Sequence, residues 1–331
     1  MDMTTHYLGL TLKSPIVASA SPLNASIDNL KQLQRFGAGA VVLPSVFEEQ
    51  INREQELLAA LIDHGAESFG EALSYFPPQI SYAYDTSHQL LLIEQAASDL
   101  DIPVIGSLNG VTDSGWIDFA RDIESAGAQA LELNIFFVPS DPAMSGSDVE
   151  QRYLDVVHSV TAAVSIPVAV KIGPYFSSPG HMAVRLAEAG ARGLVLFNRF
   201  YEPDIDPEKL AVETSLELSQ SYEMRLPLLW IGVLKGRIDA SLAATTGVET
   251  PEDVVKYLLA GADVVMTTSA LLRHGLGHMQ VLNDGLKDWL EARDLRSPDA
   301  IRGELSRGRI KNPEAYERAN YIKVLQGYGV A

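Results

Sequence analysis

A short motif, a Gly-Ala pair followed by an apolar run, recurs along the chain. It occurs as GAGAVVLPS (37–45), AGAQALELN (126–134), AGARGLVLFN (189–198) and AGADVVMTT (260–268). A segment with helical hydrophobic periodicity precedes each copy, so the glycine is typical of a helix end and the apolar run of a buried parallel strand. The repeat therefore predicts alternating helices and strands, the pattern of an α/β fold.

A second motif, Ile-Pro-Val, marks two further strands. It occurs in DIPVIGSLNG (101–110) and SIPVAVKIG (165–173), where proline separates a helix from the strand that follows. Ile102 and Ile166 are 64 positions apart, and Ala126 and Ala189 are 63 apart, so a unit of two strands and two helices repeats. With SPIVASAS (14–21) and DASLAATTG (239–247), the predicted strands are 15–19, 40–44, 103–107, 129–134, 167–172, 193–198, 240–246 and 263–268.

Eight strand–helix units predict a (β/α)8 TIM barrel, whose functional residues lie at the carboxyl ends of the strands. A doubly wound open sheet is the alternative, but the motif G-x-G-x-x-G is absent after the first strand. Residues 1–293 are expected to form one barrel domain with long loops after the second strand (46–86) and the sixth (199–238), the latter with room for a hairpin and a helix. Residues 294–331 are expected to form a helical extension that packs on the barrel or on a partner chain.

Charge and cysteine content exclude several classes of function. The 43 acidic residues outnumber 25 Lys and Arg, and the net charge of −18 argues against binding nucleic acid or an anionic membrane. The absence of cysteine excludes disulfides, thiolate nucleophiles and iron–sulfur clusters in this chain. The histidines lack metal-ligand spacing, so no metal site is predicted. Because no signal peptide or long apolar run is recognisable, a cytoplasmic protein is expected.

Polar residues stand where several predicted strands end. Lys171 in PVAVKIG is the hardest to explain as scaffold, since a buried ammonium without a partner costs several kcal/mol. Asn134 and Asn198 end apolar runs and carry the donors and acceptors that suit a planar heterocycle. Gly247, Thr268 and Ser269 follow the last two strands, where TIM barrels bind phosphate groups. These residues predict a binding site at the barrel mouth.

Over about residues 5–290 the chain resembles the dihydroorotate dehydrogenases, which are TIM barrels that contain FMN. The resemblance is closest to the cytosolic class 1 enzymes and a divergent dihydroorotate dehydrogenase-like branch. It rests on LKSPIVASAS, GAGAVVLPS, ALELN, PVAVKIGPYF, GLVLFN and TTGVETPEDVVKYLLAGADVVMTTSALLRHG. It implies FMN as the cofactor, a small-molecule substrate, a homodimer and a place in pyrimidine biosynthesis. The electron acceptor does not follow from it.

The resemblance also implies residue roles. Lys171 would stabilise the reduced flavin, and Asn134 and Asn198 would bind the substrate. The residues implied to contact FMN are Ala18, Ser19, Ser45, Asn109, Asn134, Lys171, Asn198, Thr246, Gly247, Thr268 and Ser269.

The loop after the fourth strand departs from the family pattern. Its sequence NIFFVPSDP places Phe137 where the family has its catalytic Cys or Ser, and Pro139 where it has a substrate-binding Asn. A phenyl ring cannot accept a proton, so Ser140 is the predicted base. The alternative bases are Asp141, Tyr175 and Tyr201.

The predicted function is an FMN-dependent oxidoreductase that acts on a CH–CH bond of a small, planar, anionic substrate, with weak or absent turnover of dihydroorotate. Arg199 is predicted to bind a substrate carboxylate through its planar guanidinium, with pairing to Glu202 or Asp204 as the alternative. Two other functions stay open. One is a lyase or aldolase that uses Lys171 to form a Schiff base, and the other is a flavin-binding barrel without catalysis.

Overall fold

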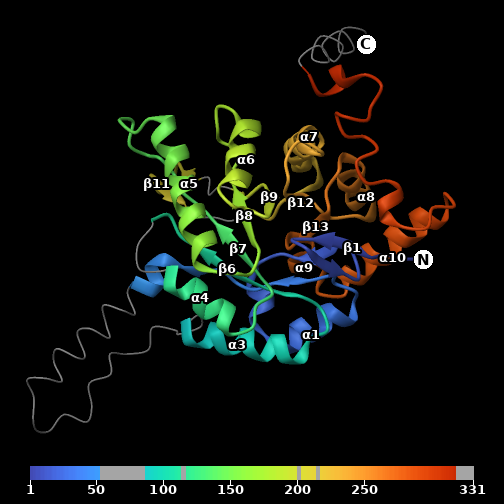
Figure 1. Ribbon diagram of the computed structural model, residues 1–331, viewed down its shortest axis with the longest axis horizontal. Helices are drawn as coiled ribbons and strands as arrows, with labels where there is room; N and C mark the ends of the chain where they lie inside the picture. The colour runs from blue at the N-terminus through green and yellow to red at the C-terminus, as the bar shows by residue number, and fades with distance from the viewer. Residues whose placement is uncertain (53–85, 113–116, 200–202, 214–216, 318–331) are drawn as a thin grey trace, which may run out of the picture.

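The protein, described by a computed structural model over residues 1–52, 86–112, 117–199, 203–213 and 217–317, is built around a ring of eight parallel strands with helices around it (Figure 1). Pairing of the second strand with the third closes the ring, which confirms the TIM barrel and rules out the open sheet. The eight strands are β3 (Ile16–Ala18), β4 (Val41–Val42), β6 (Val104–Asn109), β7 (Ala130–Asn134), β8 (Val168–Ile172), β9 (Gly193–Leu196), β12 (Ser241–Ala244) and β13 (Val264–Thr267). A short ninth strand, β5 (Val46–Phe47), pairs with the end of β6.

The helices begin and end where the local sequence predicts. Capping boxes at Ser145 and Thr250 open two of them, and the glycine of each Gly-Ala motif has a positive φ just past a helix end. The helices are α1 (Ile27–Arg35), α3 (Thr86–Asp99), α4 (Ile117–Ser125), α5 (Gly146–Ala163), α6 (Pro179–Glu188), α7 (Arg225–Leu234), α8 (Pro251–Ala260), α9 (Ser269–His274) and α10 (His278–Glu291).

The apolar core has two layers. The outer layer lies between strands and helices, and the inner layer takes at least one side chain from each barrel strand, as small as Ala130 and Ala169. The hairpin of β1 (Thr5–Tyr7) and β2 (Leu10–Leu12) adds Tyr7 and Leu12 to the inner layer. The hairpin therefore closes the amino-terminal end of the barrel and leaves the carboxyl ends of the strands as the open mouth.

Two of the three long segments are described over most of their length. The segment after β9 holds a hairpin of β10 (Asp204–Asp206) and β11 (Ala211–Glu213), a 3-10 turn (Ser221–Met224) and then α7, as expected from the sequence. The tail after α10 has 3-10 helices at Pro298–Ala300 and Pro313–Tyr316. Backbone hydrogen bonds of 2.8–2.9 Å from residues 303, 305 and 307 attach it to α8 and α7. Most of the 46–86 loop lies outside the described residues.

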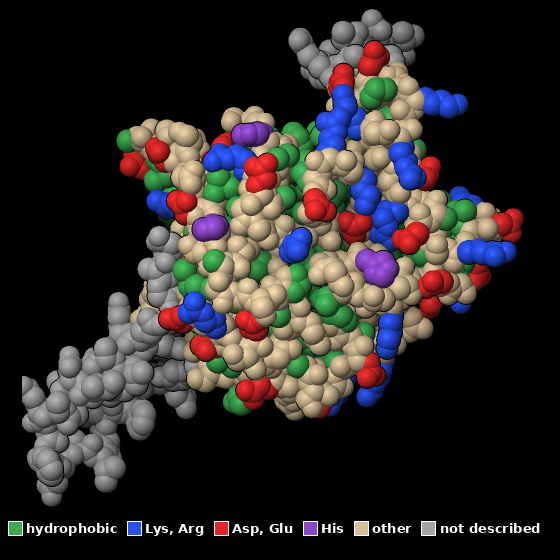
Figure 2. Space-filling model, viewed as in Figure 1, with side chains coloured by type: hydrophobic (Ala, Val, Ile, Leu, Met, Phe, Trp, Pro, Cys, Tyr) green, Lys and Arg blue, Asp and Glu red, His purple; other side chains and the backbone are tan. Residues whose placement is uncertain are grey.

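Acidic and basic side chains are mixed on the surface. Figure 2 shows acidic and basic side chains interspersed on the visible face, so the excess of acids does not form one continuous patch there. Within the part of the chain that the structure describes, no helix is both long and apolar enough to cross a membrane.

Candidate active site

Three polar side chains lie side by side at the barrel mouth. Strand register places Asn109 of β6 opposite Asn134 of β7, and Asn134 opposite Lys171 of β8. All three face the barrel interior, because they alternate with residues of the outer layer. Asn109 and Lys171 are buried, and Asn134 is half-buried. The sequence prediction that these residues share one site is consistent with this arrangement.

The Lys171 ammonium lies above a buried carboxylate. Its Nζ is 3.5 Å from Oε1 of Glu132, which precedes Asn134 by two residues on β7 and so faces the same interior. The Glu132 side chain is 1% exposed, and its Oε2 has no hydrogen-bond partner among the described residues. An ammonium has three N–H donors, so one long contact leaves it able to bind a further acceptor.

Amide and hydroxyl pairs complete this side of the mouth. Asn198, which follows β9, donates from Nδ2 to Oδ1 of Asn134 at 2.8 Å. In this pair Asn134 uses its carbonyl oxygen and Asn198 its amide nitrogen, which leaves the Asn134 NH2 as a donor and the Asn198 carbonyl oxygen as an acceptor for a ligand. Ser45 lies 2.7 Å from Ser107, hydroxyl to hydroxyl, so its side chain is already paired.

A cavity of about 280 Å³ lies beside Lys171 and extends toward the last two strands, and the predicted residues Asn109, Asn134 and Ser45 are not among those that line it. Its size is near the lower end for small-molecule sites. The predicted residues that line it are Ser19, Lys171, Asn198, Arg199, Thr246, Gly247, Thr268 and Ser269. The two loops expected to bind phosphate, 245–248 and 267–269, follow neighbouring strands and both line it. Ala18 packs into the outer core layer, so its side chain points away from this cavity.

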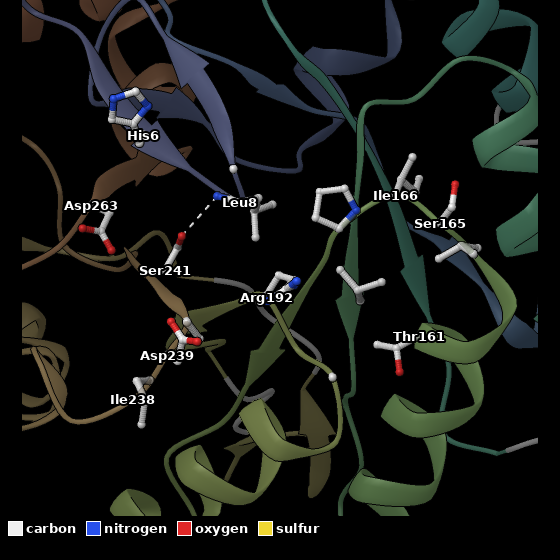
Figure 3. A pocket seen from close by; sticks show the side chains of 16 residues that line it. His6, Leu8, Thr161, Ser165, Ile166, Arg192, Ile238, Asp239, Ser241 and Asp263 are labelled. Atoms are coloured by element: carbon white, nitrogen blue, oxygen red, sulfur yellow. Dashed lines mark hydrogen bonds between the residues drawn. The ribbon is translucent and has the colours of Figure 1, made fainter.

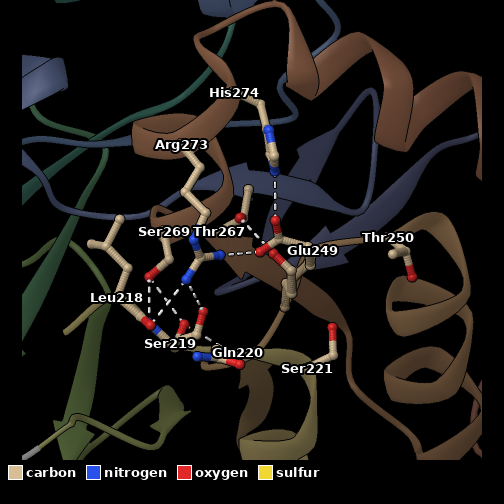
Figure 4. A network of polar contacts seen from close by, with 12 residues as sticks. Leu218, Ser219, Gln220, Ser221, Glu249, Thr250, Thr267, Ser269, Arg273 and His274 are labelled. Carbon is tan, nitrogen blue, oxygen red and sulfur yellow. Dashed lines mark hydrogen bonds and ion pairs between the residues drawn. The ribbon is translucent and has the colours of Figure 1, made fainter.

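One wall of the cavity is formed by residues 217–219, the start of the 217–224 segment that leads into α7. Ser219 is buried there and its hydroxyl accepts a hydrogen bond from the Gly247 amide at 3.2 Å and donates to Ser269 at 3.0 Å. Arg273 of α9 donates to the carbonyls of Leu218 and Ser219 and pairs with Glu249 (Figure 4). The segment is thus fastened to both predicted phosphate loops.

Gly247 and Arg199 interact with the same segment. Gly247 has φ of +73°, and a Cβ there would lie 2.7 Å from the Gln220 carbonyl oxygen, so the chain itself requires a glycine. Arg199 donates to the Glu217 carbonyl and pairs with Glu223 at 3.1 Å. Its acidic partner among the described residues is therefore Glu223 rather than Asp204, one of the two that the sequence suggested. Glu202 lies outside the described residues.

A buried tyrosine supports the loop after β12. The Tyr257 hydroxyl lies 3.1 and 2.7 Å from the carbonyl oxygens of Thr245 and Thr246, to which it donates. Burial, followed by the nearby charge of Asp253, raises the pKa of Tyr257 well above its usual value, so the hydroxyl stays a donor. This bond holds Thr246 in a left-handed conformation, with φ of +80°, at the edge of the cavity.

The residues of the 135–145 loop stand apart from this cavity. Ser140 is exposed, and so are the alternative bases Asp141 and Tyr175, while Tyr201 lies outside the described residues. The Phe137 ring packs under the guanidinium of Arg152, 4.3 Å from ring centroid to Cζ, and against the outer core layer. No proton acceptor replaces it at that position.

A larger cavity of about 700 Å³ lies at the opposite end of the barrel. Figure 3 shows His6, Arg192, Asp239 and Asp263 around it, close to the β1–β2 hairpin and the starts of the strands. In TIM barrels residues at this end serve stability, and the functional residues lie at the other. The smaller cavity at the mouth is therefore the candidate site despite its size.

The histidines do not form a metal site in the described part of the chain. His274 contacts Glu249 at 2.5 Å, and His278 contacts the Glu249 carbonyl oxygen at 2.7 Å. No group of three or more His, Asp or Glu side chains among the described residues is placed to hold a metal ion.

Three residues of the site were not predicted. Glu132 had a usable signal, because it is a charged residue within the apolar part of the run ALELN. It stands two positions before Asn134, so both side chains are expected on the same face of the strand. Ser219 and Arg273 had none. They reach the site from an insertion and from the back of a short helix, and no local pattern distinguishes such residues from ordinary surface polar groups.

Comparison with known proteins identifies the family of this chain. The family model described as dihydroorotate dehydrogenase matches residues 82–290, more than half of the chain. A protein of Aeropyrum pernix provisionally named dihydroorotate dehydrogenase A (fumarate) is 30% identical over 220 residues, 64% of this chain and 70% of the relative. The catalytic subunit of dihydroorotate dehydrogenase B (NAD(+)) from Methanocella arvoryzae is 24% identical over 304 residues, 91% and 97% of the two chains. The same subunit from Listeria welshimeri is 26% identical over 268 residues, 78% and 83% of the two chains. The chain therefore belongs to the dihydroorotate dehydrogenase family.

Proposed function

We propose that the protein is an FMN-dependent oxidoreductase that acts on a CH–CH bond of a small, planar, anionic substrate. The observation that carries this proposal is the buried Lys171 ammonium, in register with Asn134 and Asn109 at the mouth of a barrel of this family. A positive charge held in place beside a cofactor favours the electron-rich state that the cofactor reaches on reduction.

The residues at the mouth fit a flavin mononucleotide. Lys171 and the row of asparagine side chains offer N–H donors to a polar ring edge, and Ser19 lies in the same cavity. The small residues of the 245–248 and 267–269 loops would accommodate a phosphate group. Ser269 accepts hydrogen bonds from Ser219 and can donate its own proton to the phosphate, whereas the Thr268 hydroxyl donates to the Ser19 carbonyl. When bound, FMN supplies the hydride acceptor that the protein's own side chains lack.

The substrate would lie against the pair of amides. The free donor of Asn134 and the free acceptor of Asn198 match one N–H and one carbonyl group on the edge of a heterocycle. Arg199 adds a guanidinium at the rim, where a substrate carboxylate would compete with Glu223 for it. This competition favours an anion of fixed planar geometry, because such a group can bind two N–H donors at once.

Ser140 is the proposed base, and the exposed stretch 138–143 of its loop would bring it to the substrate. Ser140→Ala should lower the rate of flavin reduction by about a hundredfold or more. Ser177→Ala, an exposed serine after β8, is the matched control and should leave the rate unchanged. Equal rates for the wild type and Ser140→Ala would exclude the role of Ser140 as the base.

With Phe137 turned toward α5, we expect weak or absent turnover of dihydroorotate.

The absorption spectrum of the purified protein tests the proposed function. We expect a yellow protein with flavin bands that dithionite bleaches, or an apo-protein that gains them on addition of FMN. A colourless protein that takes up no FMN would contradict the proposal. Sedimentation equilibrium would test the homodimer, which we propose from the family.

A lyase or aldolase with Lys171 as the nucleophile is the second candidate. Formation of a Schiff base needs an amine that is free to attack a carbonyl carbon, whereas Nζ of Lys171 lies 3.5 Å from the Glu132 carboxylate as a partner in an ion pair. Borohydride would trap a carbonyl compound on Lys171 only in the aldolase. A third candidate, a barrel that binds flavin without catalysis, would show flavin bands that no reduced substrate bleaches.

A further inference from the structure

Glu132 is a charged residue in the least accessible part of the barrel. Its neighbours on the interior face of the strands include Ala130 on its own strand and Ala169 and Val195 of the inner core layer. The side chain is 1% exposed, and an ionised carboxylate without compensation is costly there. Among the described residues, the cation that contacts Glu132 is the Lys171 ammonium.

The carboxylate is only partly satisfied by that contact. Its Oε1 faces Lys171 at 3.5 Å, and its Oε2 has no hydrogen-bond partner among the described residues. The buried hydroxyl of Tyr7, from the hairpin that closes the barrel, is also without a partner in the described structure. Burial, and then the charge of Glu132, raises the pKa of Tyr7 well above its usual value. A scaffold ion pair would be expected to satisfy its oxygens, so a structural role alone does not account for Glu132.

We propose that Glu132 is a positioning residue for Lys171, which holds the ammonium at the barrel mouth and reduces the positive charge that a bound flavin meets. The inference rests on the proposed function, because it assigns Glu132 a role toward the FMN site. The carboxylate lies on the barrel side of the ammonium and the cavity lies on the other. The pair therefore presents a partly neutralised cation, and the strength of that cation depends on Glu132.

Sulfite binding measures the charge beside the flavin without any substrate. Sulfite adds through its sulfur lone pair to the oxidised flavin and leaves a negative charge on the ring, so a stronger neighbouring cation tightens the adduct.

At pH 6.5 we expect Glu132→Gln to bind sulfite about tenfold more tightly than the wild type. Glu132→Asp, which keeps the charge, should stay within about threefold. Asp263→Asn, which removes an acid at the opposite end of the barrel, should leave the affinity unchanged. Unchanged or weaker sulfite binding by Glu132→Gln would overturn the proposal.

A cycle of unfolding experiments tests the pair without a flavin. Glu132→Gln and Lys171→Gln should each lower the urea midpoint, whereas the double variant should recover most of the loss, because each single change leaves one buried charge without its partner. Additive losses would overturn the pairing. If the protein takes up no FMN, the proposed function fails, and this cycle still decides whether Glu132 positions Lys171.

Discussion

The two ends of the barrel each contain a lysine paired with an acid, and the two pairs differ. At the closed end, Nζ of Lys235 lies 2.8 Å from Asp263, whose other oxygen accepts the Leu242 amide. At the mouth, Nζ of Lys171 lies 3.5 Å from Glu132, which keeps one oxygen without a partner. The closed-end pair is also the more exposed of the two.

This difference indicates that the closed-end pair stabilises the fold and that the mouth pair serves function. A pair whose atoms are satisfied at a moderately exposed position can stabilise the fold, whereas a buried pair left partly unsatisfied costs stability. The mouth pair is therefore expected to be retained for what the ammonium does to a ligand. The lysine and tyrosine variants that follow compare the two ends.

The largest expected effect comes from removing the ammonium at the mouth. With FMN bound, Lys171→Met should weaken sulfite binding about a hundredfold, because one preorganised charge is lost from the site. Lys235→Met should leave sulfite binding within about twofold. Titration of the flavin absorbance with sulfite gives both values, and similar losses in the two variants would remove the functional distinction between the ends.

The closed-end pair should contribute to the free energy of unfolding. Lys235→Met should lower the free energy of unfolding by about 2 kcal/mol, since Asp263 stays half-buried without its nearest cation. Urea unfolding monitored by circular dichroism measures this loss. An unchanged midpoint would show that Arg302, 3.9 Å from Asp263, compensates fully, and that this pair does not stabilise the fold.

Two buried tyrosines, Tyr257 near the mouth and Tyr7 at the closed end, offer a smaller contrast. Tyr257→Phe should cost about 1 kcal/mol of unfolding free energy, because the carbonyls of Thr245 and Thr246 lose their donor. Tyr7→Phe should cost nothing or stabilise slightly, since the Tyr7 hydroxyl has no described partner to lose. Thermal unfolding of the two variants measures both changes. A larger loss of stability in Tyr7→Phe than in Tyr257→Phe would reveal a hydrogen bond of Tyr7 at the closed end.

The smallest expected effect is a pH dependence at Asp253. Burial raises its pKa, but hydrogen bonds from Ser221, Lys256 and Thr250 lower it more, so the folded value lies below 3.8. The stabilisation is therefore complete above about pH 4 and is lost as the pH falls through the folded pKa. Asp253→Asn should show a shallower loss of stability below about pH 4 than the wild type in urea unfolding at a series of pH values. Parallel curves would contradict this.

The fold could be predicted from the sequence because each of its units carries a local signal. The Gly-Ala motifs place helix ends and strands such as β7 and β13 within one or two residues of their observed bounds. The row of Asn109, Asn134 and Lys171 follows from strand ends and register alone. The 217–224 wall could not be predicted, because Ser219 meets Ser269 across 50 positions of chain through an inserted segment.

Binding of FMN to variants of the two cavities tests the central claim most directly. Ser269→Asp places a negative charge in the mouth cavity, and Ile238→Asp places one in the cavity at the closed end. Equilibrium dialysis should show one FMN per chain for the wild type and for Ile238→Asp, and an affinity at least tenfold weaker for Ser269→Asp. Full binding by Ser269→Asp together with loss in Ile238→Asp would place the flavin at the wrong end of the barrel and contradict the account.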